Sequence, residues 1–519
     1  MRVLLVILLL TFAWAQDFPF ADVRPGLEGH LRTAAEGNEL VDIPLTVISI
    51  QDAQVAGEPL ILVRLHGELA EQYGGVASGM SGSPVYTRIH GQDRLIGAIG
   101  YAFAESDGLY GLVTPIAIMR AGTAGSAAGQ ATNLLLSGTA RSLEVLEAAF
   151  GPLAAQQLGT SRTLAPAAET VPGSAVAVAL ATGDVTIAAI GTVTAIDTNE
   201  VLLLGHPLLN LGNASYALQP VSITAIIPSR HIPFKLANIH NEIIGAVHRD
   251  VPGGLAATLG QQPNHIPVTI RIHGHHGEFR HEVAIMNDER LSAPVLHAAL
   301  VELFDRALVS PQGGSAQLQW HIALAGYSDP IVMHELAASS ADIAGLAAEY
   351  GATPLALLAW NEFRDFTVTH VTLDITFEPT VAVARVAKIV LPTEELLPGA
   401  TTTLNVRFQP YRQEAVVRSI DIQLPEDAPA ELVLVARGGS APRPEHLDHE
   451  RNPITRDFAP QSFGEYLTSL GDHVKSSEFI IEYEAEPGEW RRLARITLPF
   501  AVVSAHEVTL EIVQPEDEP

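Results

Sequence analysis

A serine held in a tight, glycine-flanked turn is the feature of this chain that most directly indicates chemistry. Residues 79–84 read Gly-Met-Ser-Gly-Ser-Pro. Glycines on both sides of Ser81 allow backbone angles that other residues avoid, and they clear the path of a substrate carbonyl. The pattern therefore predicts an exposed, nucleophilic hydroxyl. The competing interpretation is a Gly-Ser turn in an inert barrel. We expect Ser83 to be a turn hydroxyl that bonds to the backbone.

A serine hydroxyl attacks a carbonyl only when a base takes its proton, and imidazole has the required basicity near neutral pH. Among the 20 histidines, His206 follows the apolar run 201–204 and lies between a glycine and a proline. Such a turn fixes the backbone and can leave the ring facing a cleft. We therefore expect His206 to be the base, with His66 and His30 as the alternatives.

Several other histidines gather around one predicted hairpin tip, without a cysteine or a rigid aspartate among them. Metal sites need ligands at fixed geometry, so we expect a solvated turn there and no metal or other cofactor. The members of this group are His265, His273, His275, His276 and His281.

The segments around these residues read mainly as β-strands. Alternating and buried apolar runs with turn signals place Ser81 in one β unit and His206 in a second, with helical spacing between them. Further helical spacing follows at 293–310 and 329–361, and strands then recur at a spacing typical of sandwiches. Residues 341–361 resemble the helical half of a LysM glycan-binding module, although the flanking sequence favours a plain packing helix pair.

The start of the chain has the composition of a secretory signal. Arg2 precedes an apolar run over 3–13 that ends in Ala-Trp-Ala, and this run is too short to cross a bilayer. We expect a signal peptide over 1–15, a mature chain from Gln16, and a periplasmic or extracellular protein. An uncleaved membrane anchor is the alternative. No later run predicts a membrane span after the signal is removed.

Charge and cysteine content exclude other classes. The chain of 519 residues carries a formal net charge of -28, which repels nucleic acid and anionic membranes. It has no cysteine, so no disulfide can support it in an oxidising compartment, and apolar burial must provide stability. The sequence does not indicate an oligomeric state.

Blocks spread over about residues 20–320 resemble one peptidase family. The serine turn is similar to the Gly-Asp-Ser-Gly-Gly-Pro turn of trypsin-like peptidases, and its methionine and second serine resemble the family of the stage IV sporulation protein B more closely. Other blocks with this resemblance are 24–29, 60–65, 73–77, 111–116, 172–176, 189–194 and 204–207. The resemblance implies a trypsin-like double β-barrel and a serine endopeptidase that cleaves polypeptides, with Ser81 as nucleophile and His206 as base.

The resemblance also implies roles for neighbouring groups. By analogy with the trypsin-like turn, the backbone amides of Gly79 and Ser81 would form the oxyanion hole. The strand that contains Gly100 and Tyr101 would pair with an extended substrate. The serine half precedes the histidine half here, the reverse of the trypsin-like order, but geometry rather than chain order defines such sites.

The acid that orients the histidine in this family does not carry over to this chain. Its position is occupied by His66, followed by Gly67 and Glu68. Asp184 and Asp197 are the candidates in the histidine half, and a Ser-His pair without an acid is the alternative. A non-catalytic scaffold that binds a protein or a cell-envelope partner is the second functional hypothesis.

We therefore expect a mainly β chain with helical connectors: a double barrel, then helices, then a C-terminal sandwich-like region. In chain order the predicted parts are a peptidase domain over 20–325 (serine unit 20–115, helical connector 116–170, histidine unit 171–290), a helical segment over 326–365 and a C-terminal β region over 366–515.

Overall fold

The computed structural model describes residues 16–514, apart from 56–57, 104–105, 123–133, 137–139, 151–155, 158–168, 230, 275–276, 309–311, 393–394, 443–459 and 487–488. It is mainly β, with 54% strand and 16% helix, which confirms the predicted fold class. Contacts divide the chain into two compact units, with the boundary after Asn264 apart from two short segments, Glu144–Ala149 and Gly183–Val185, that group with unit 2. The predicted signal peptide lies outside the described residues.

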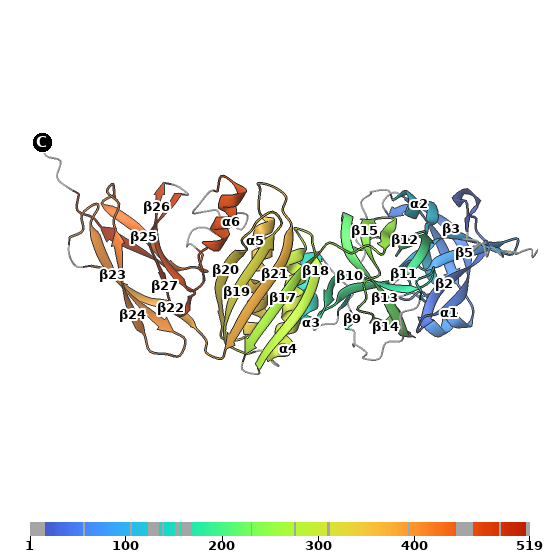
Figure 1. The fold of residues 1–519 in the computed structure, drawn as a ribbon, viewed down its shortest axis with the longest axis horizontal. Coiled ribbons are helices and arrows are strands. Elements are labelled where there is room, and N and C mark those ends of the chain that lie inside the picture. Colours follow the sequence, from blue (N-terminus) through green and yellow to red (C-terminus); the bar gives the residue numbers. More distant parts are fainter. Residues whose placement is uncertain are drawn as a thin grey trace, which may run out of the picture. The chain divides into compact units, whose positions relative to one another are not determined.

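The first half of unit 1 is a closed, six-stranded antiparallel barrel (Figure 1). The strands follow the order β6-β5-β2-β3-β4-β7, and pairing of β6 with β7 closes the barrel. Leu31, Ile43, Leu45 and Val63 belong to its fully buried core. The bounds are β2 (Glu28–Glu36), β3 (Glu39–Val55), β4 (Glu58–Leu65), β5 (Pro84–Ile89), β6 (Gln92–Ala102) and β7 (Tyr110–Pro115), with α1 (Glu68–Tyr73) between β4 and β5.

The second half of unit 1 is another closed, six-stranded barrel, in the order β10-β13-β15-β16-β12-β11. Its bounds are β10 (Ala175–Gly183), β11 (Ile187–Asp197), β12 (Glu200–Leu203), β13 (Gly212–Ile227), β15 (Gly245–Val251) and β16 (Gly254–Leu259). One further strand, β14 (Phe234–Ile239), pairs with β13. The predicted double barrel is thus confirmed, with Ser81 in the first barrel's loops and His206 in the second's.

An apolar cluster joins the two barrels. It consists of Tyr86, Leu95, Ala98, Ile116, Met119, Ala195, Leu202 and Ala256. Burying such side chains contributes roughly 25 cal/mol per Å² of apolar surface, so the cluster holds the barrels in one arrangement. The predicted connector includes the helices α2 (Ile116–Ala121) and α3 (Ala140–Phe150) and the short strands β8 (Leu134–Leu136) and β9 (Gln156–Gln157). Before the barrel lie β1 (Gln16–Asp17), which pairs with β6, and the 3-10 turn η1 (Phe20–Asp22).

Unit 2 begins with a five-stranded sheet in the order β20-β19-β21-β17-β18. Its elements are β17 (His265–Gly274), β18 (Gly277–Met286), α4 (Ser292–Leu308), β19 (Gly314–Leu324), β20 (Ile331–Ser339), α5 (Ile343–Ala359) and β21 (Val368–Glu378). The helices α4 and α5 pack against each other and against this sheet, and both are largely buried.

Parts of this sheet differ from the expected domain limits. The β17–β18 hairpin was expected in the histidine unit that ends at 290, but β17 pairs in parallel with β21, more than ninety residues later. The expected helical stretch from 329 begins with strand β20, whose buried Met333 and Ala337 also fit helical spacing. The expected helix pair is one continuous helix, α5, with Pro354 inside it.

The C-terminal part of unit 2 is a β-sandwich, as expected, but it begins at β22 (Val383–Val390) and not at 366, because β21 pairs with β17 and β19 of the preceding sheet. One sheet contains β22, β23 (Thr401–Pro410), β24 (Val416–Gln423) and β28 (Ala501–Val502), and the other contains β25 (Glu431–Gly438), β26 (Glu478–Glu486), β27 (Glu489–Thr497) and β29 (Ala505–Glu511). Phe408, Phe479 and Phe500 pack in one buried cluster between them. The helix α6 (Phe463–Gly471) precedes β26.

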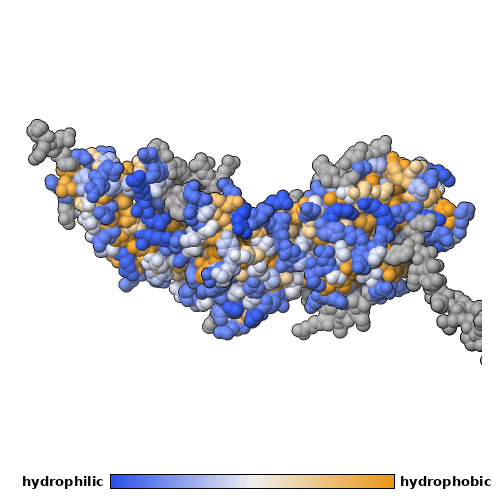
Figure 2. All heavy atoms as spheres, turned by 45° about the horizontal axis from the view of Figure 1, so that its top comes forward, coloured by the Kyte–Doolittle hydropathy of each residue, from blue (hydrophilic) through white to orange (hydrophobic). Residues whose placement is uncertain are grey.

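Among the described residues, no helix combines the length and the apolar character that a bilayer crossing requires. Figure 2 shows hydrophilic residues intermixed with apolar ones over the face in view. Single exposed apolar side chains of this kind are normal on folded proteins.

The serine turn provides a test of how closely the two barrels fit. Gly82 and Gly26 both have positive φ, 91° and 84°, but a methyl group at Gly82 would collide with the backbone of Thr192 and Leu204, whereas one at Gly26 would meet nothing within 4 Å. Gly26→Ala should therefore destabilise unit 1 by about 1–2 kcal/mol, the cost of the left-handed conformation alone. Gly82→Ala should cost more than about 4 kcal/mol. Amide hydrogen exchange of β11 and β12, followed as a function of urea concentration, measures the loss of stability in each variant. Equal losses in Gly26→Ala and Gly82→Ala would contradict the close fit of the two barrels.

Candidate functional site

The serine turn links α1 to β5, and both of its glycines need conformations that other residues avoid. Gly79 and Gly82 each have a φ of 91°. Each also touches another part of unit 1: a Cβ on Gly79 would lie 3.2 Å from the Cβ of Lys235 on β14, and Gly82 packs on Thr192 and Leu204. Ser81, between them, is only half-buried. The two glycines thus let the turn pack tightly while the serine stays accessible.

Every backbone carbonyl of the turn from Ala77 to Ser83 accepts a hydrogen bond. The second barrel and β14 provide the donors for four of them. The donors are Met80 N–H to Ala77, Lys235 N–H to Ser78, the Thr192 hydroxyl to Gly79, Ser83 N–H to Met80, Thr192 N–H to Ser81, the Thr194 hydroxyl to Gly82, and Ile99 N–H to Ser83. The turn is therefore held in one conformation by hydrogen bonds along its whole length.

Two backbone N–H groups of the same turn are different. Within the described part of the chain, the N–H groups of Gly79 and Ser81 have no hydrogen-bond partner, whereas those of Ser78, Met80, Gly82 and Ser83 are all bonded. A trans peptide points its N–H opposite to its C=O. The bonded carbonyls of Ser78 and Met80 therefore fix the two peptide planes that present these free N–H groups. Two fixed, unoccupied donors beside a serine are what an oxyanion hole requires.

The backbone before His206 is strained. Leu204 has a φ of 64°, and Gly205 N–H donates to the Leu203 carbonyl at 2.8 Å, which closes a γ-turn of the rare, positive-φ kind. Bulky residues seldom adopt such angles, and strain of this type is kept where the surroundings enforce it. Here the Thr114 hydroxyl donates to the Gly205 carbonyl at 2.5 Å, so the first barrel holds the turn.

The His206 ring has one nitrogen occupied. Its Nδ1 lies 2.7 Å from the Pro207 carbonyl, and since a carbonyl only accepts, we assign the proton to Nδ1. The Nε2 atom is then left with its lone pair, as a base requires. Burial lowers the pKa of His206 below its ordinary value, which keeps the ring neutral at neutral pH. The ring also contacts Tyr101, whose ring centroid lies 5.7 Å away.

The structure brings the two turns together although Ser81 and His206 are far apart in the sequence. Gly82 packs against the backbone of Leu204, and Thr192 N–H donates to the Ser81 carbonyl at 2.8 Å. The Ser81 hydroxyl and the His206 ring do not form a hydrogen bond in this structure. Catalytic pairs without substrate are often longer than a hydrogen bond, so the missing bond by itself does not decide between a catalytic and a structural role.

The carboxylate that acts on His206 is Asp250, at the end of β15. Asp250 is fully buried and accepts hydrogen bonds from Leu208 N–H, Leu209 N–H and the Tyr216 hydroxyl, each at 2.8 Å. These bonds hold the loop directly after His206. The negative charge of Asp250 also raises the pKa of His206, partly opposing burial. Asp250 therefore positions the loop and favours the protonated imidazole.

The two expected acids lie elsewhere. Asp197 forms an ion pair with Arg120 on α2. Asp184 accepts hydrogen bonds within unit 2, from Glu282 N–H at 3.0 Å and at 3.2 Å from the His281 ring.

The alternative bases also have other neighbours. The His66 ring lies 3.3 Å from the Thr46 hydroxyl and 3.6 Å from Glu28. The His30 ring is near Asp42 and Asp93 and packs on Tyr86.

Ser83 is fully buried and donates its hydroxyl to the Thr33 hydroxyl at 2.9 Å, so its partner is a side chain and not the expected backbone group.

Gly100 and Tyr101 both lie on β6, beside the turn that contains His206. Gly100 lies at a bulge in the pairing of β6 with β7 and packs against the Gly205 carbonyl. Tyr101 is buried beside His206, and burial raises its pKa to about 12, so its hydroxyl stays neutral.

The histidine-rich hairpin is β17–β18. The His273 and His281 rings face Glu278 and Asp184, and His275 and His276 at the tip lie outside the described residues. Over the described ranges no group of three or more His, Cys, Asp or Glu side chains could hold a metal ion.

Three residues of the site were missed by sequence reasoning: Asp250, Lys235 and Thr192. The burial of their strand positions carries the missing signal: β14 alternates between buried and half-buried positions, and β11 is buried along nearly its whole length. Lys235 shares the buried face of β14 with Ala237, and Asp250 lies among buried residues at the end of β15. A charged residue at an inward position of a strand costs stability unless it has a purpose or a partner.

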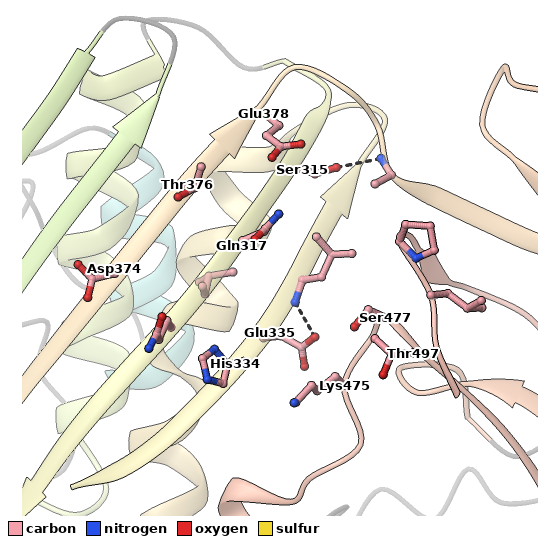
Figure 3. A pocket seen from close by; sticks show the side chains of 16 residues that line it. Ser315, Gln317, His334, Glu335, Asp374, Thr376, Glu378, Lys475, Ser477 and Thr497 are labelled. Atoms are coloured by element: carbon pink, nitrogen blue, oxygen red, sulfur yellow. Dashed lines mark hydrogen bonds between the residues drawn. The ribbon is translucent and has the colours of Figure 1, made fainter. Parts of the chain in front are cut away.

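A cavity of about 410 Å³ in unit 2 is separate from this site (Figure 3). Polar side chains from β19, β20 and β21 line it, together with Lys475, Ser477 and Thr497. Its hydroxyl at Ser315 is already engaged, because it donates to the Thr380 carbonyl and accepts Ala382 N–H. Figure 3 shows Glu335 likewise held by a backbone N–H. None of the sequence-predicted site residues lines the cavity.

Replacing Asp250 by Asn tests its link to His206. Both carboxylate oxygens of Asp250 accept hydrogen bonds, whereas one end of the Asn side chain is an NH₂ group that can only donate. At least one donor therefore loses its acceptor, and the free energy of unfolding of unit 1 should fall by about 2–3 kcal/mol. Because the charge of Asp250 raises the pKa of His206, the variant should lower that pKa further, as measured by NMR titration of the imidazole. Asp197→Asn, at an exposed ion pair, should cost about 0–1 kcal/mol and leave the titration unchanged. An unchanged His206 pKa in Asp250→Asn would disprove the link.

Comparisons of this chain with models of protein families, with curated proteins and with solved structures found no match. The resemblance to the peptidase family of the stage IV sporulation protein B therefore stays a prediction from the sequence.

Proposed function

We propose that this chain is an exported serine endopeptidase of the stage IV sporulation protein B type, with Ser81 as the nucleophile and His206 as its base. The observation that carries the proposal is the serine turn itself. All of its carbonyls are bonded, and of the amides from Ser78 to Ser83 only those of Gly79 and Ser81 have no partner within the described part of the chain. A turn with a purely structural role would gain nothing from the free donor of the buried Gly79, because an N–H group buried without a partner costs free energy.

In the proposed reaction, the Ser81 hydroxyl oxygen attacks the carbonyl carbon of a peptide bond while Nε2 of His206 takes the hydroxyl proton. The carbonyl oxygen becomes an oxyanion, which accepts hydrogen bonds from Gly79 N–H and Ser81 N–H. His206 then donates its proton to the leaving amine, and the C–N bond breaks. Water, deprotonated by the same ring, hydrolyses the acyl-enzyme and restores Ser81.

Asp250 and Tyr101 serve this cycle without taking part in bond changes. Asp250 stabilises the protonated imidazole by its charge and by holding the loop after it. Tyr101 packs its ring on His206 and limits the ring's rotation. The substrate is a polypeptide in extended conformation, and the β6 segment around Gly100 and Tyr101 is the surface along which we expect it to pair.

Two serine variants test the proposal. Ser81→Ala should abolish both fluorophosphonate labelling and peptide hydrolysis, with a loss of about 10⁴-fold or more, because it removes the nucleophile. It should leave stability nearly unchanged, since the Ser81 hydroxyl makes no hydrogen bond within the described residues. Ser83→Ala is the matched control two positions away: it removes the bond to Thr33 at a cost of about 1 kcal/mol and should keep labelling.

A His206→Ala variant completes the comparison. It should lose about as much activity as Ser81→Ala, and the double variant little more, because the two residues act as one unit. A wild-type chain that folds but takes no label would reject the peptidase and favour the scaffold that binds a protein or cell-envelope partner. Near-normal cleavage by Ser81→Ala would reject Ser81.

Export rests on the basic, apolar and Ala-Trp-Ala pattern of residues 1–15. We expect the secreted or periplasmic protein to start at or near Gln16, and N-terminal sequencing measures this directly. A chain that retains Met1 and fractionates with membranes would instead indicate an anchor.

A further inference from the structure

Lys235 is the most unusual ionisable residue near the site, because it is a buried lysine that has no carboxylate partner among the described residues. It is 1% exposed, on the inner face of β14. Its Nζ lies 2.7 Å from the Thr33 hydroxyl and 3.5 Å from the Thr192 hydroxyl. An unpaired buried ammonium is costly, and burial alone lowers the pKa of Lys235 to about 7. The groups that contact the Lys235 side chain are the Thr33 hydroxyl on β2, the Thr192 hydroxyl on β11 and Gly79 in the serine turn. None of them titrates near neutral pH.

Each part of Lys235 contacts the framework of the oxyanion hole. Its backbone N–H donates to the Ser78 carbonyl at 3.0 Å and so fixes the peptide plane that presents Gly79 N–H. Its methylene chain packs directly against Gly79. Its Nζ reaches Thr192, whose hydroxyl and N–H hold the carbonyls of Gly79 and Ser81.

We propose that Lys235 is a positioning residue of the oxyanion hole, and that its ammonium lies behind the serine turn and stabilises the negative charge that forms on the substrate side. The inference rests on the proposed function, since it needs an anion at Ser81. In a poorly solvated interior such charges interact more strongly than in water. The effect is reciprocal: an anion held by Gly79 N–H and Ser81 N–H favours the ammonium and raises the pKa of Lys235.

The pH dependence follows with a definite sign. His206 acts as a base only when neutral, so activity falls as the pH drops below its lowered pKa. Lys235 carries its charge below about pH 7 and loses it as the pH rises through that value. We therefore expect a bell-shaped profile of kcat/KM, with the acid limb from His206 and the alkaline limb from Lys235.

The chain allows a direct measurement, because it contains only three lysines: Lys235, Lys388 and Lys475. Lysine labelled with ¹³C at Cε should give three NMR signals in the full-length protein, with the exposed Lys388 as internal control. The Lys235 signal should titrate near pH 7. Phenylboronic acid supplies the anion: its boron bonds to the Ser81 oxygen, the hydroxyl proton leaves to His206 or solvent, and boron becomes tetrahedral and negative. In this adduct the Lys235 titration should move up by about one pH unit or more, which corresponds to at least tenfold tighter binding of the boronate.

Lys235→Met keeps the apolar chain without the charge and is the matching variant. At pH 6.5, where Lys235 is only partly charged in the free protein, the variant should bind the boronate about eightfold less tightly for a shift of one pH unit, and it should lose the alkaline limb of kcat/KM. Lys388→Met should change neither. If the boronate adduct forms but the pKa of Lys235 does not change, the inference about Lys235 is wrong, while the proposed peptidase function still stands. This measurement uses the wild-type chain, so it decides the question even if Lys235→Met fails to fold. If ¹¹B NMR shows no tetrahedral boron with the folded wild-type chain, the nucleophile itself is rejected, and this inference with it.

Discussion

The arrangement of the site depends on Thr192, a fully buried residue of the second barrel that binds the serine turn of the first. Its N–H donates to the Ser81 carbonyl and its hydroxyl to the Gly79 carbonyl. A hydrogen bond of this kind contributes about 1 kcal/mol net, but a buried carbonyl left without a partner costs more. The turn can therefore keep its conformation only while the two barrels stay together. Thr192 thus holds the peptide groups on either side of Met80–Ser81, while Lys235 N–H and Ser83 N–H, through the carbonyls of Ser78 and Met80, fix the planes of the Gly79 and Ser81 N–H groups.

The strained backbone before His206 also depends on contact between the two barrels. Leu204 and Gly205 both have positive φ, and the γ-turn they form is held by Thr114 from the first barrel and packs against Gly82. An isolated loop would relax such a turn, because it costs of order 1–3 kcal/mol per strained residue. Each barrel thus maintains an unfavourable backbone conformation in the other. Because this dependence is mutual, it does not matter which barrel comes first along the chain.

Features that depend on residues close together in the sequence could be predicted, whereas features that depend on distant residues could not. The positive φ of Gly79 and Gly82 and the strand-turn setting of His206 are local properties, and local patterns indicate them. The double barrel follows from strands and turns that recur over two segments. Asp250 and Lys235 depend on pairings between strands distant in sequence, and an inward-facing charge can be recognised only once the alternation of its strand is known. The parallel pairing of β17 with β21 was missed for the same reason, since no short-range signal links His265–Gly274 to Val368–Glu378.

Burial acts on the two basic groups, His206 and Lys235, in the same direction. It lowers the pKa of His206 and of Lys235, because desolvation disfavours the cation in each case. In the proposed reaction the consequences are opposite, since a base must be neutral and an ammonium must be charged to act on an anion. Asp250 offsets part of the effect at His206, whereas no described carboxylate does so at Lys235. A site enclosed more tightly would gain a stronger oxyanion environment and lose its ammonium, so the depth at which the turn lies sets a compromise between the two.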